Sequence, residues 1–146
     1  MTQRAKGFFE AYFKRLYRDR DLSVIEELRS PEAGTKGLTR SGSYRDLVIR
    51  VFEVFDDTDV VIDRVVEQGD EAAVFVRFRG RAKDGRAVEV PGSGYVRFEN
   101  GRIAHAENVW DVLALFTSLG EPIGGVSTFA DALEVVGRQH GRKEAT

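Results

Sequence analysis

The sequence contains no cysteine, and it has only three prolines, two histidines and one tryptophan in 146 residues. Without cysteine the chain can form no disulfide, no thiolate nucleophile and no cysteine-ligated metal site. The two histidines, His105 and His140, lie far apart in the sequence, whereas a metal site needs several clustered ligands. We therefore expect no metal, and no motif in the chain calls for another cofactor.

An excess of charge of one sign and long apolar runs are also lacking. The chain has 22 basic and 24 acidic residues, a formal net charge of −2, and no basic stripe. This balance gives no indication of a nucleic-acid partner. No run approaches the roughly 20 apolar residues of a membrane span, and the first residues are charged, without the apolar stretch of a secretory leader. We expect no membrane partner and a cytoplasmic protein.

The overall composition, 42% hydrophobic and 32% charged, is typical of a globular protein. A chain of this length is most simply one domain with a single core. We therefore interpret residues 1–146 as one domain, with a core over residues 3–120 and a C-terminal helical extension over residues 121–146.

Helical periodicity dominates the first 55 residues, and it predicts three helices. The second is short and lies in residues 21–30, with Asp21 as its N-cap, and Ser43 caps the third, whose apolar face runs from Tyr44 to Phe55. The first helix is amphipathic, and its apolar residues are Phe8, Phe9, Tyr12, Phe13, Leu16 and Tyr17.

The tail of the chain predicts a further helix. Thr128 and Asp131 form a capping box, and Phe129, Leu133 and Val136 follow at helical spacing as an apolar stripe.

From Asp59 onward the apolar period changes from 3.6 to 2, which predicts strands over residues 59–67, 72–82, 86–99 and 102–110. The second and third strands are separated by an Asp-Gly pair at residues 84–85, and the third and fourth by an Asn-Gly pair at residues 100–101. Such pairs are the strongest short signals of a β-hairpin. Helices followed by a meander of hairpins predict an α+β protein, with the helices on one face of a curved antiparallel sheet.

Two stretches of the sequence sharpen this prediction. FDDTDVVIDRVVEQGDEAAVFVRFRG, residues 55–80, and ENGRIAHAENVWDVLALFTSLG, residues 99–120, resemble the corresponding stretches of SnoaL-like proteins, the polyketide cyclases and their relatives. These belong to the nuclear transport factor 2-like, or cystatin-like, superfamily. The resemblance implies a cone of three N-terminal helices packed on a curved antiparallel meander, here with a C-terminal helix added.

The same resemblance implies a role for Asp111, which follows the last strand as the proposed acid or base of SnoaL-like cyclases does. As an acid it would have to be desolvated among apolar side chains such as Trp110 and Phe116. Asp111 is also placed to cap the helix that follows, by accepting from the backbone N–H of residue 113 or 114. Both interpretations stay open. The steroid isomerases of this fold use a tyrosine and a carboxylate at positions that fall here on Phe13 and near Gly37, so we do not expect their mechanism.

Strand alternation indicates which residues face the helices. In the last strand the inner set is Ala104, Ala106, Asn108 and Trp110. Asn108 is then a polar side chain on an apolar face, where it needs a partner from backbone, water or ligand. Gly92 and Gly94 on the third strand either leave room for a ligand or mark a β-bulge. We predict a pocket with Asp111 and Asn108 as its catalytic residues and with the following ligand-binding residues: Tyr12, Phe55, Val76, Val96, Trp110 and Phe116.

The outer face of the predicted sheet carries more apolar surface than a monomer usually leaves exposed. Its apolar residues are Ile62, Phe75 and Tyr95, and His105 lies on the same side as a surface or interface residue. We therefore predict a homodimer through this face.

Two functions fit the sequence. The first is a cofactor-free acid/base enzyme of the polyketide cyclase or isomerase kind, acting on a small hydrophobic carbonyl substrate. Asp111 would move a proton, while Asn108 and a tyrosine of the first helix would bind the developing enolate oxygen. The second is a ligand-binding or dimerisation module of the same fold without enzymatic activity. The sequence does not identify the ligand.

Overall fold

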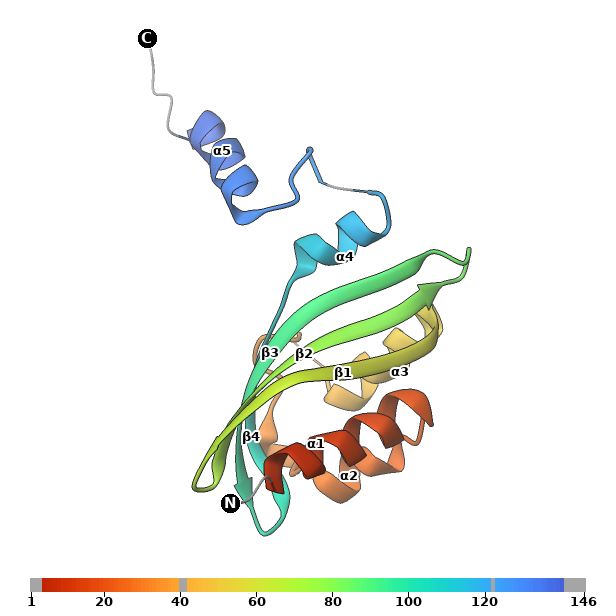
Figure 1. The fold of residues 1–146 in the computed structure, drawn as a ribbon, viewed down its shortest axis with the longest axis vertical. Coiled ribbons are helices and arrows are strands. Elements are labelled where there is room, and N and C mark those ends of the chain that lie inside the picture. Colours follow the sequence, from red (N-terminus) through yellow and green to blue (C-terminus); the bar gives the residue numbers. More distant parts are fainter. Residues whose placement is uncertain (1–3, 40–41, 122, 141–146) are drawn as a thin grey trace.

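The structure, a computed structural model, describes residues 4–39, 42–121 and 123–140. Helices precede a four-stranded sheet and two more helices follow it (Figure 1), which confirms the predicted α+β architecture. The helical segments before the sheet are α1 Arg4–Phe13, η1 Lys14–Arg18, α2 Ser23–Leu28, η2 Pro31–Ala33 and α3 Tyr44–Val54. The sheet and the helices after it are β1 Phe55–Gln68, β2 Glu71–Ala82, β3 Ala87–Glu99, β4 Arg102–Trp110, α4 Val112–Ser118 and α5 Phe129–His140.

The first predicted helix changes its winding part of the way along. Residues up to Phe13 form α1, and η1 continues as a π-helical turn in which the backbone N–H of Asp19 donates to the carbonyl of Lys14 at 3.0 Å. A π-turn bonds residues five apart, so a residue and its fifth successor come to nearly the same side of the helix. Tyr12 and Tyr17 are therefore both buried against the core, with 2% and 8% of their surface exposed.

The next two helices begin close to where the sequence predicts. Asp21 accepts hydrogen bonds from the backbone N–H and the hydroxyl of Ser23, at 3.0 and 2.5 Å, just before α2. Ser43 caps α3 by accepting from the backbone N–H of Asp46 at 3.0 Å, as predicted. Val24 and Ile25 of α2 are both buried in the core.

The sheet is antiparallel throughout, with strand order β1-β2-β3-β4. Asn100 and Gly101 both have positive φ, 54° and 76°, as a tight hairpin turn between right-twisted strands requires. The first strand begins at Phe55, not at Asp59 as predicted. Near Asp57, whose φ is +48°, the pairing of β1 with β2 shifts register. This irregularity interrupts the alternation of apolar and polar residues, so the sequence pattern does not show the start of the strand.

The inner face of the sheet packs against α1, η1 and α3 and forms the core. Its buried apolar residues are Phe55, Val60, Ala72, Val74, Val76, Val88, Val90, Val96, Ile103 and Ala106. The predicted side of the sheet is wrong for two residues, because β-bulges shift the alternation of side chains by one residue. Ile62 pairs with Val76 and packs against the core, not on the outer face, and Ile103 is only 2% exposed.

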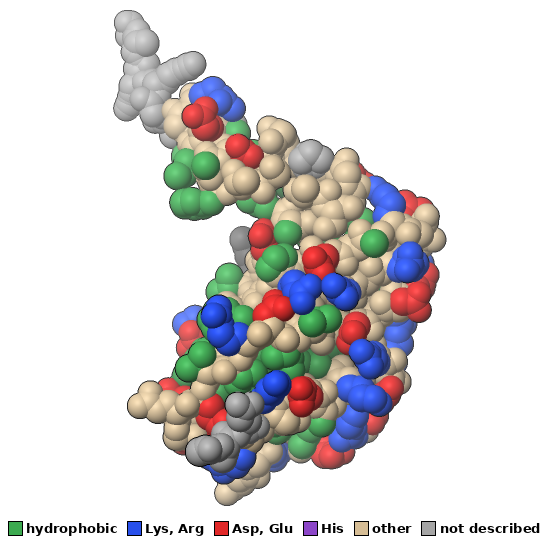
Figure 2. Space-filling model, viewed as in Figure 1, with side chains coloured by type: hydrophobic (Ala, Val, Ile, Leu, Met, Phe, Trp, Pro, Cys, Tyr) green, Lys and Arg blue, Asp and Glu red, His purple; other side chains and the backbone are tan. Residues whose placement is uncertain are grey.

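The C-terminal helix α5 forms as predicted. The hydroxyl of Thr128 accepts from the backbone N–H of Asp131, whose carboxylate accepts from the backbone N–H of Thr128, which completes the capping box. Its apolar stripe stays open to solvent, since Phe129 is 75% exposed and Leu133 55%. Figures 1 and 2 show α5 beyond α4, with apolar side chains on one side, and it does not cover the outer face of the sheet. None of the helices in the described chain is long and apolar enough to cross a membrane.

Candidate functional site

An apolar pocket of about 310 Å³ lies between the inner face of the sheet and the helices. The strands contribute Phe55, Val74, Val76, Phe78, Val90, Ser93, Gly94, Asn108 and Trp110. The helices and the loop before α3 contribute Phe13, Tyr17, Gly37, Leu38, Tyr44, Leu47, Val51, Val112 and Leu115. None of the described residues that line this pocket is acidic or basic.

Asn108 is the polar residue that β4 contributes to the wall. Its side-chain Nδ2 is buried and has no hydrogen-bond partner among the described residues. A buried amide donor without a partner costs roughly 1–3 kcal/mol. The amide of Asn108 can therefore donate a hydrogen bond to a molecule in the pocket.

The two glycines of β3 make room for side chains of β4. Gly92 lies opposite Trp110, and a Cβ on Gly92 would come within 2.3 Å of the indole. Gly94 lies opposite Asn108, and a Cβ there would come within 3.1 Å of its Oδ1. The pairing of β3 with both neighbours keeps its register through these positions, so the glycines do not mark a bulge.

The loop before α3 closes one side of the pocket by packing on β4. The backbone N–H of Asn108 donates to the carbonyl of Lys36 at 2.9 Å. The next residue, Gly37, has a φ of +87°, and a Cβ there would come within 1.6 Å of the carbonyl oxygen of Asn108. Only glycine fits at this approach. The sequence shows this stretch as a loop rich in glycine, without indicating that it forms part of the site.

Tyrosine hydroxyls form the polar side of the pocket opposite β4. Tyr17 and Tyr44 both line it, and their hydroxyl oxygens are 3.5 Å apart. Burial raises the pKa of Tyr17 well above its ordinary value, and the neighbouring Tyr44 adds to the effect, so Tyr17 stays protonated and able to donate. Tyr44 lies on the predicted apolar face of the third helix, and periodicity alone does not show that this residue reaches a pocket.

The structure brings together only part of the predicted site. The predicted residues that line the pocket are Phe55, Val76, Asn108 and Trp110. Tyr12 and Val96 are buried in the core and not in the lining, and Phe116 is half-buried on α4 outside it. Periodicity finds the apolar face of each element, but it does not distinguish the residues that pack together from those that surround a space.

Asp111 does not line the pocket of the structure, contrary to the prediction, and its side chain is exposed. Its Oδ1 accepts from the backbone N–H of Ala114 at 2.9 Å, which makes it the N-cap of α4. Trp110 faces inward, and consecutive residues leaving a strand point to opposite sides. The capping interpretation of Asp111 is therefore confirmed, and its role in any reaction stays a prediction.

These residues can enclose an apolar molecule and give it hydrogen bonds from an amide and from phenols. The described lining residues include no carboxylate or imidazole, so they provide no group suited to proton transfer near neutral pH. Among the residues that the structure describes, no group of three or more histidine and carboxylate side chains is arranged to hold a metal ion.

The match to a family model agrees with this architecture. The model of the SnoaL-like domain matches residues 9–106, from α1 into β4. The chain belongs to the SnoaL-like domain family. A comparison with curated proteins finds no match.

Solved structures of other proteins share the fold of this chain. TsrD from Streptomyces laurentii is 22% identical with a TM-score of 0.69, over 80% of this chain and 95% of that one. IdmH from Streptomyces antibioticus is 19% identical with a TM-score of 0.68, over 82% and 99%. A protein of ketosteroid isomerase-like fold from Catenulispora acidiphila, in complex with trimethylamine, is 13% identical with a TM-score of 0.67, over 79% and 93%. At these identities the likeness shows the fold alone, the nuclear transport factor 2-like α+β cone.

Proposed function

We propose that this SnoaL-like protein binds a small, largely apolar molecule in the pocket between the sheet and α3. The observation that carries the proposal is the lining itself, which is apolar and aromatic except for a few groups such as the unpartnered Nδ2 of Asn108. Pockets of this kind, about 300 Å³ or larger with a small number of polar groups, are typical of small-molecule sites. Asn108 orients the ligand by donating to a carbonyl or similar oxygen.

A cofactor-free cyclase or isomerase is the second candidate. IdmH carries the provisional description of a polyketide cyclase, and the family resemblance assigns an acid or base to the position of Asp111. Against this, Asp111 is exposed and caps a helix, and the lining residues that the structure describes include no carboxylate. This geometry supports binding more than acid/base catalysis, because the carboxylate of Asp111 is not part of the described lining.

Binding can be tested with 2-acetylnaphthalene, an uncharged two-ring ketone, by isothermal titration calorimetry. We expect saturable binding to the wild type and its loss in Val51→Phe, which fills the pocket from α3. Ile49→Phe adds the same ring to the same helix at a residue outside the lining, so it should bind like the wild type. No binding to the wild type, or equal loss in both variants, contradicts the proposal.

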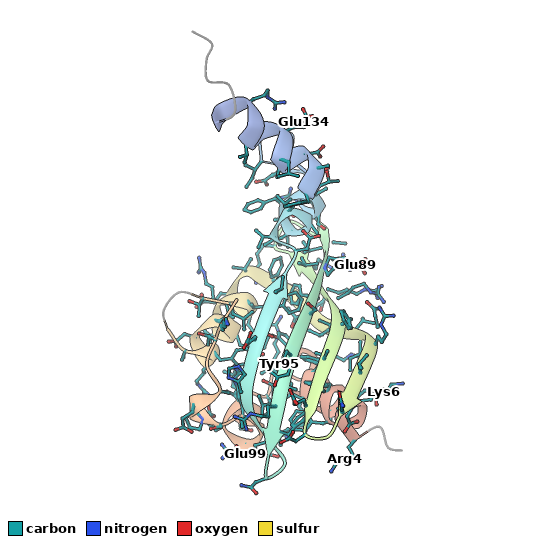
Figure 3. The ribbon with its side chains drawn as sticks, turned by 90° about the vertical axis from the view of Figure 1, so that its left-hand side faces the viewer. Arg4, Lys6, Glu89, Tyr95, Glu99 and Glu134 are labelled. Atoms are coloured by element: carbon teal, nitrogen blue, oxygen red, sulfur yellow. The ribbon has the colours of Figure 1, made fainter. Side chains whose placement is uncertain are left out.

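A homodimer through the outer sheet face remains a proposal with narrower support. Figure 3 shows this face, with Tyr95 near the middle of β3. Tyr95 donates to Glu71 at 2.6 Å and packs beside His105, and the guanidinium of Arg64 lies over the ring of Phe75. The apolar area left for an interface centres on Phe75, 38% exposed, and Val109, 69% exposed. Sedimentation velocity at micromolar concentration should show a dimer that Phe75→Glu dissociates, and a monomeric wild type contradicts it. The cytoplasmic location stays a prediction.

A further inference from the structure

Arg29, at the end of α2, is a buried cation. Only 7% of the residue is exposed, and its guanidinium donates to the carbonyl of Gly34. Its Cζ lies 4.2 Å from the centroid of the Tyr44 ring. No carboxylate of the described residues forms an ion pair with Arg29, whereas most arginines on the surface of this chain do pair with one.

A buried charge without a counter-ion is costly, because removal from water is not offset by an opposite charge. A carbonyl and an aromatic ring compensate only part of this loss. An anionic group bound nearby would compensate for the rest. Tyr44 connects Arg29 to the pocket, because Arg29 stacks on its ring and Tyr44 also lines the pocket.

The hydrogen-bonding groups of the pocket also favour an anionic ligand. The Nδ2 of Asn108 has no acceptor among the residues in the described ranges. The hydroxyls of Tyr17 and Tyr44 are 3.5 Å apart, which is too long for a strong mutual hydrogen bond. Both hydroxyls can therefore turn to a ligand oxygen. Within the described part of the lining there is no carboxylate to repel an anion.

We propose that the ligand is an acid, an apolar molecule whose carboxylate binds between Tyr44 and Asn108 with the charge of Arg29 behind the Tyr44 ring. The proposal rests on the proposed function, since it requires the pocket to bind a ligand, and it adds the chemical class of that ligand. The phenol of Tyr44 and the amide of Asn108 donate to the carboxylate oxygens, and Arg29 supplies the compensating charge without touching the pocket surface.

The test compares two probes of nearly equal shape, 2-naphthoate and 2-acetylnaphthalene, by isothermal titration calorimetry at pH 7.5. We expect the wild type to bind 2-naphthoate about tenfold more tightly or better, as hydrogen bonds to a charged group imply. Arg29→Met should abolish this preference. The matched control, Arg45→Met, removes an exposed guanidinium that pairs with Glu26 at 3.1 Å, and it should keep the preference.

Tyr44→Phe provides a second test if Arg29→Met does not fold, because it removes one donor and keeps the ring under Arg29. It should reduce the preference for 2-naphthoate severalfold and leave binding of 2-acetylnaphthalene almost unchanged. Equal affinity of the wild type for both probes overturns the proposal while leaving the pocket function intact. The proposal is also overturned if folded Arg29→Met, or Tyr44→Phe, prefers 2-naphthoate as strongly as the wild type does. If neither probe binds the wild type, the proposed function itself is contradicted, and this inference with it.

Discussion

Gly92 and Trp110 face each other across β3 and β4, and the glycine leaves the space that the indole occupies. A Cβ on Gly92 would lie 2.3 Å from Cε3 of Trp110, far inside a normal contact. The only tryptophan of the chain thus forms a wall of the pocket because its neighbour has no side chain.

Gly92→Ala should therefore displace the indole and lower the free energy of unfolding by about 1–3 kcal/mol, the usual range for overpacking. Fluorescence of Trp110 reports the displacement directly, and chemical denaturation gives the change in stability. Gly7→Ala is the control, since a Cβ at this position of α1 meets nothing within 4 Å. It should stabilise the chain by up to about 1 kcal/mol. A wild-type spectrum and stability in Gly92→Ala would show that Trp110 is not held as described.

Substitutions of Asp111 should affect stability in the way expected of a helix cap. Asp111→Asn should leave the free energy of unfolding almost unchanged, because asparagine caps as well as aspartate, whereas Asp111→Ala should lower it by about 1 kcal/mol. Urea denaturation of both variants measures the difference. Equal losses in the two variants would mean that the carboxylate charge, and not the cap, contributes the stability.

Tyr12 should make the protein sensitive to alkali. Its buried hydroxyl lies beside Tyr44 and Arg29 but makes no hydrogen bond of good geometry with a described residue. Burial, to which Tyr44 adds, raises its pKa well above the ordinary value of about 10. The folded state therefore favours the neutral phenol. This contribution is fully present below pH 10 and is lost as the pH rises through the unfolded value towards the folded one.

Tyr12→Phe should reduce this alkaline loss. At pH 7 it should leave stability unchanged or raise it by up to about 1 kcal/mol, because it removes an unpaired polar group. Thermal unfolding from pH 7 to 11 measures both effects. A clear destabilisation at pH 7 would indicate that the hydroxyl has a hydrogen-bond partner in solution.

The ion pair of Asp63 with Arg77 should give stability the opposite pH dependence, a loss in acid. The hydrogen bonds from Arg77, at 2.8–3.0 Å, hold the pKa of Asp63 below its ordinary value. The stability from this pair is present above the ordinary Asp pKa of about 4 and is lost as the pH falls through the lower folded value. Arg77→Gln should raise the pKa of Asp63 in a carboxyl NMR titration, and Arg45→Gln should leave it unchanged. An unshifted Asp63 in Arg77→Gln contradicts the pairing.

Local signals in the sequence were enough to predict the class of the fold. The change of period and the Asn-Gly turn at residues 100–101 depend on backbone preferences that operate within a few residues. The bulge that turns Ile103 inward does not, because it depends on how β4 pairs with β3. Strand alternation, which predicts that Ile103 faces outward, therefore fails at this position.

The site was predictable only in part, for a related reason. Asn108 and Trp110 are found by alternation along one strand. The contribution of Gly37 depends on a loop meeting β4, and that of Tyr44 on the packing of α3. Asp111 is one residue beyond Trp110, where the chain leaves the strand, and its cap interaction with Ala114 directs its side chain outward.

The loop segment that carries Lys36 also protects an edge of the sheet. Edge strands present unpaired backbone groups that can recruit another chain. On β4 these groups are partly occupied, since Ser30 donates to Ile103 at 2.8 Å and Asn108 donates to Lys36. The other edge, β1, carries two register shifts. The same loop therefore encloses the pocket and guards against aggregation. Because only glycine fits at position 37, a side chain there would expose a strand edge as well as open the pocket.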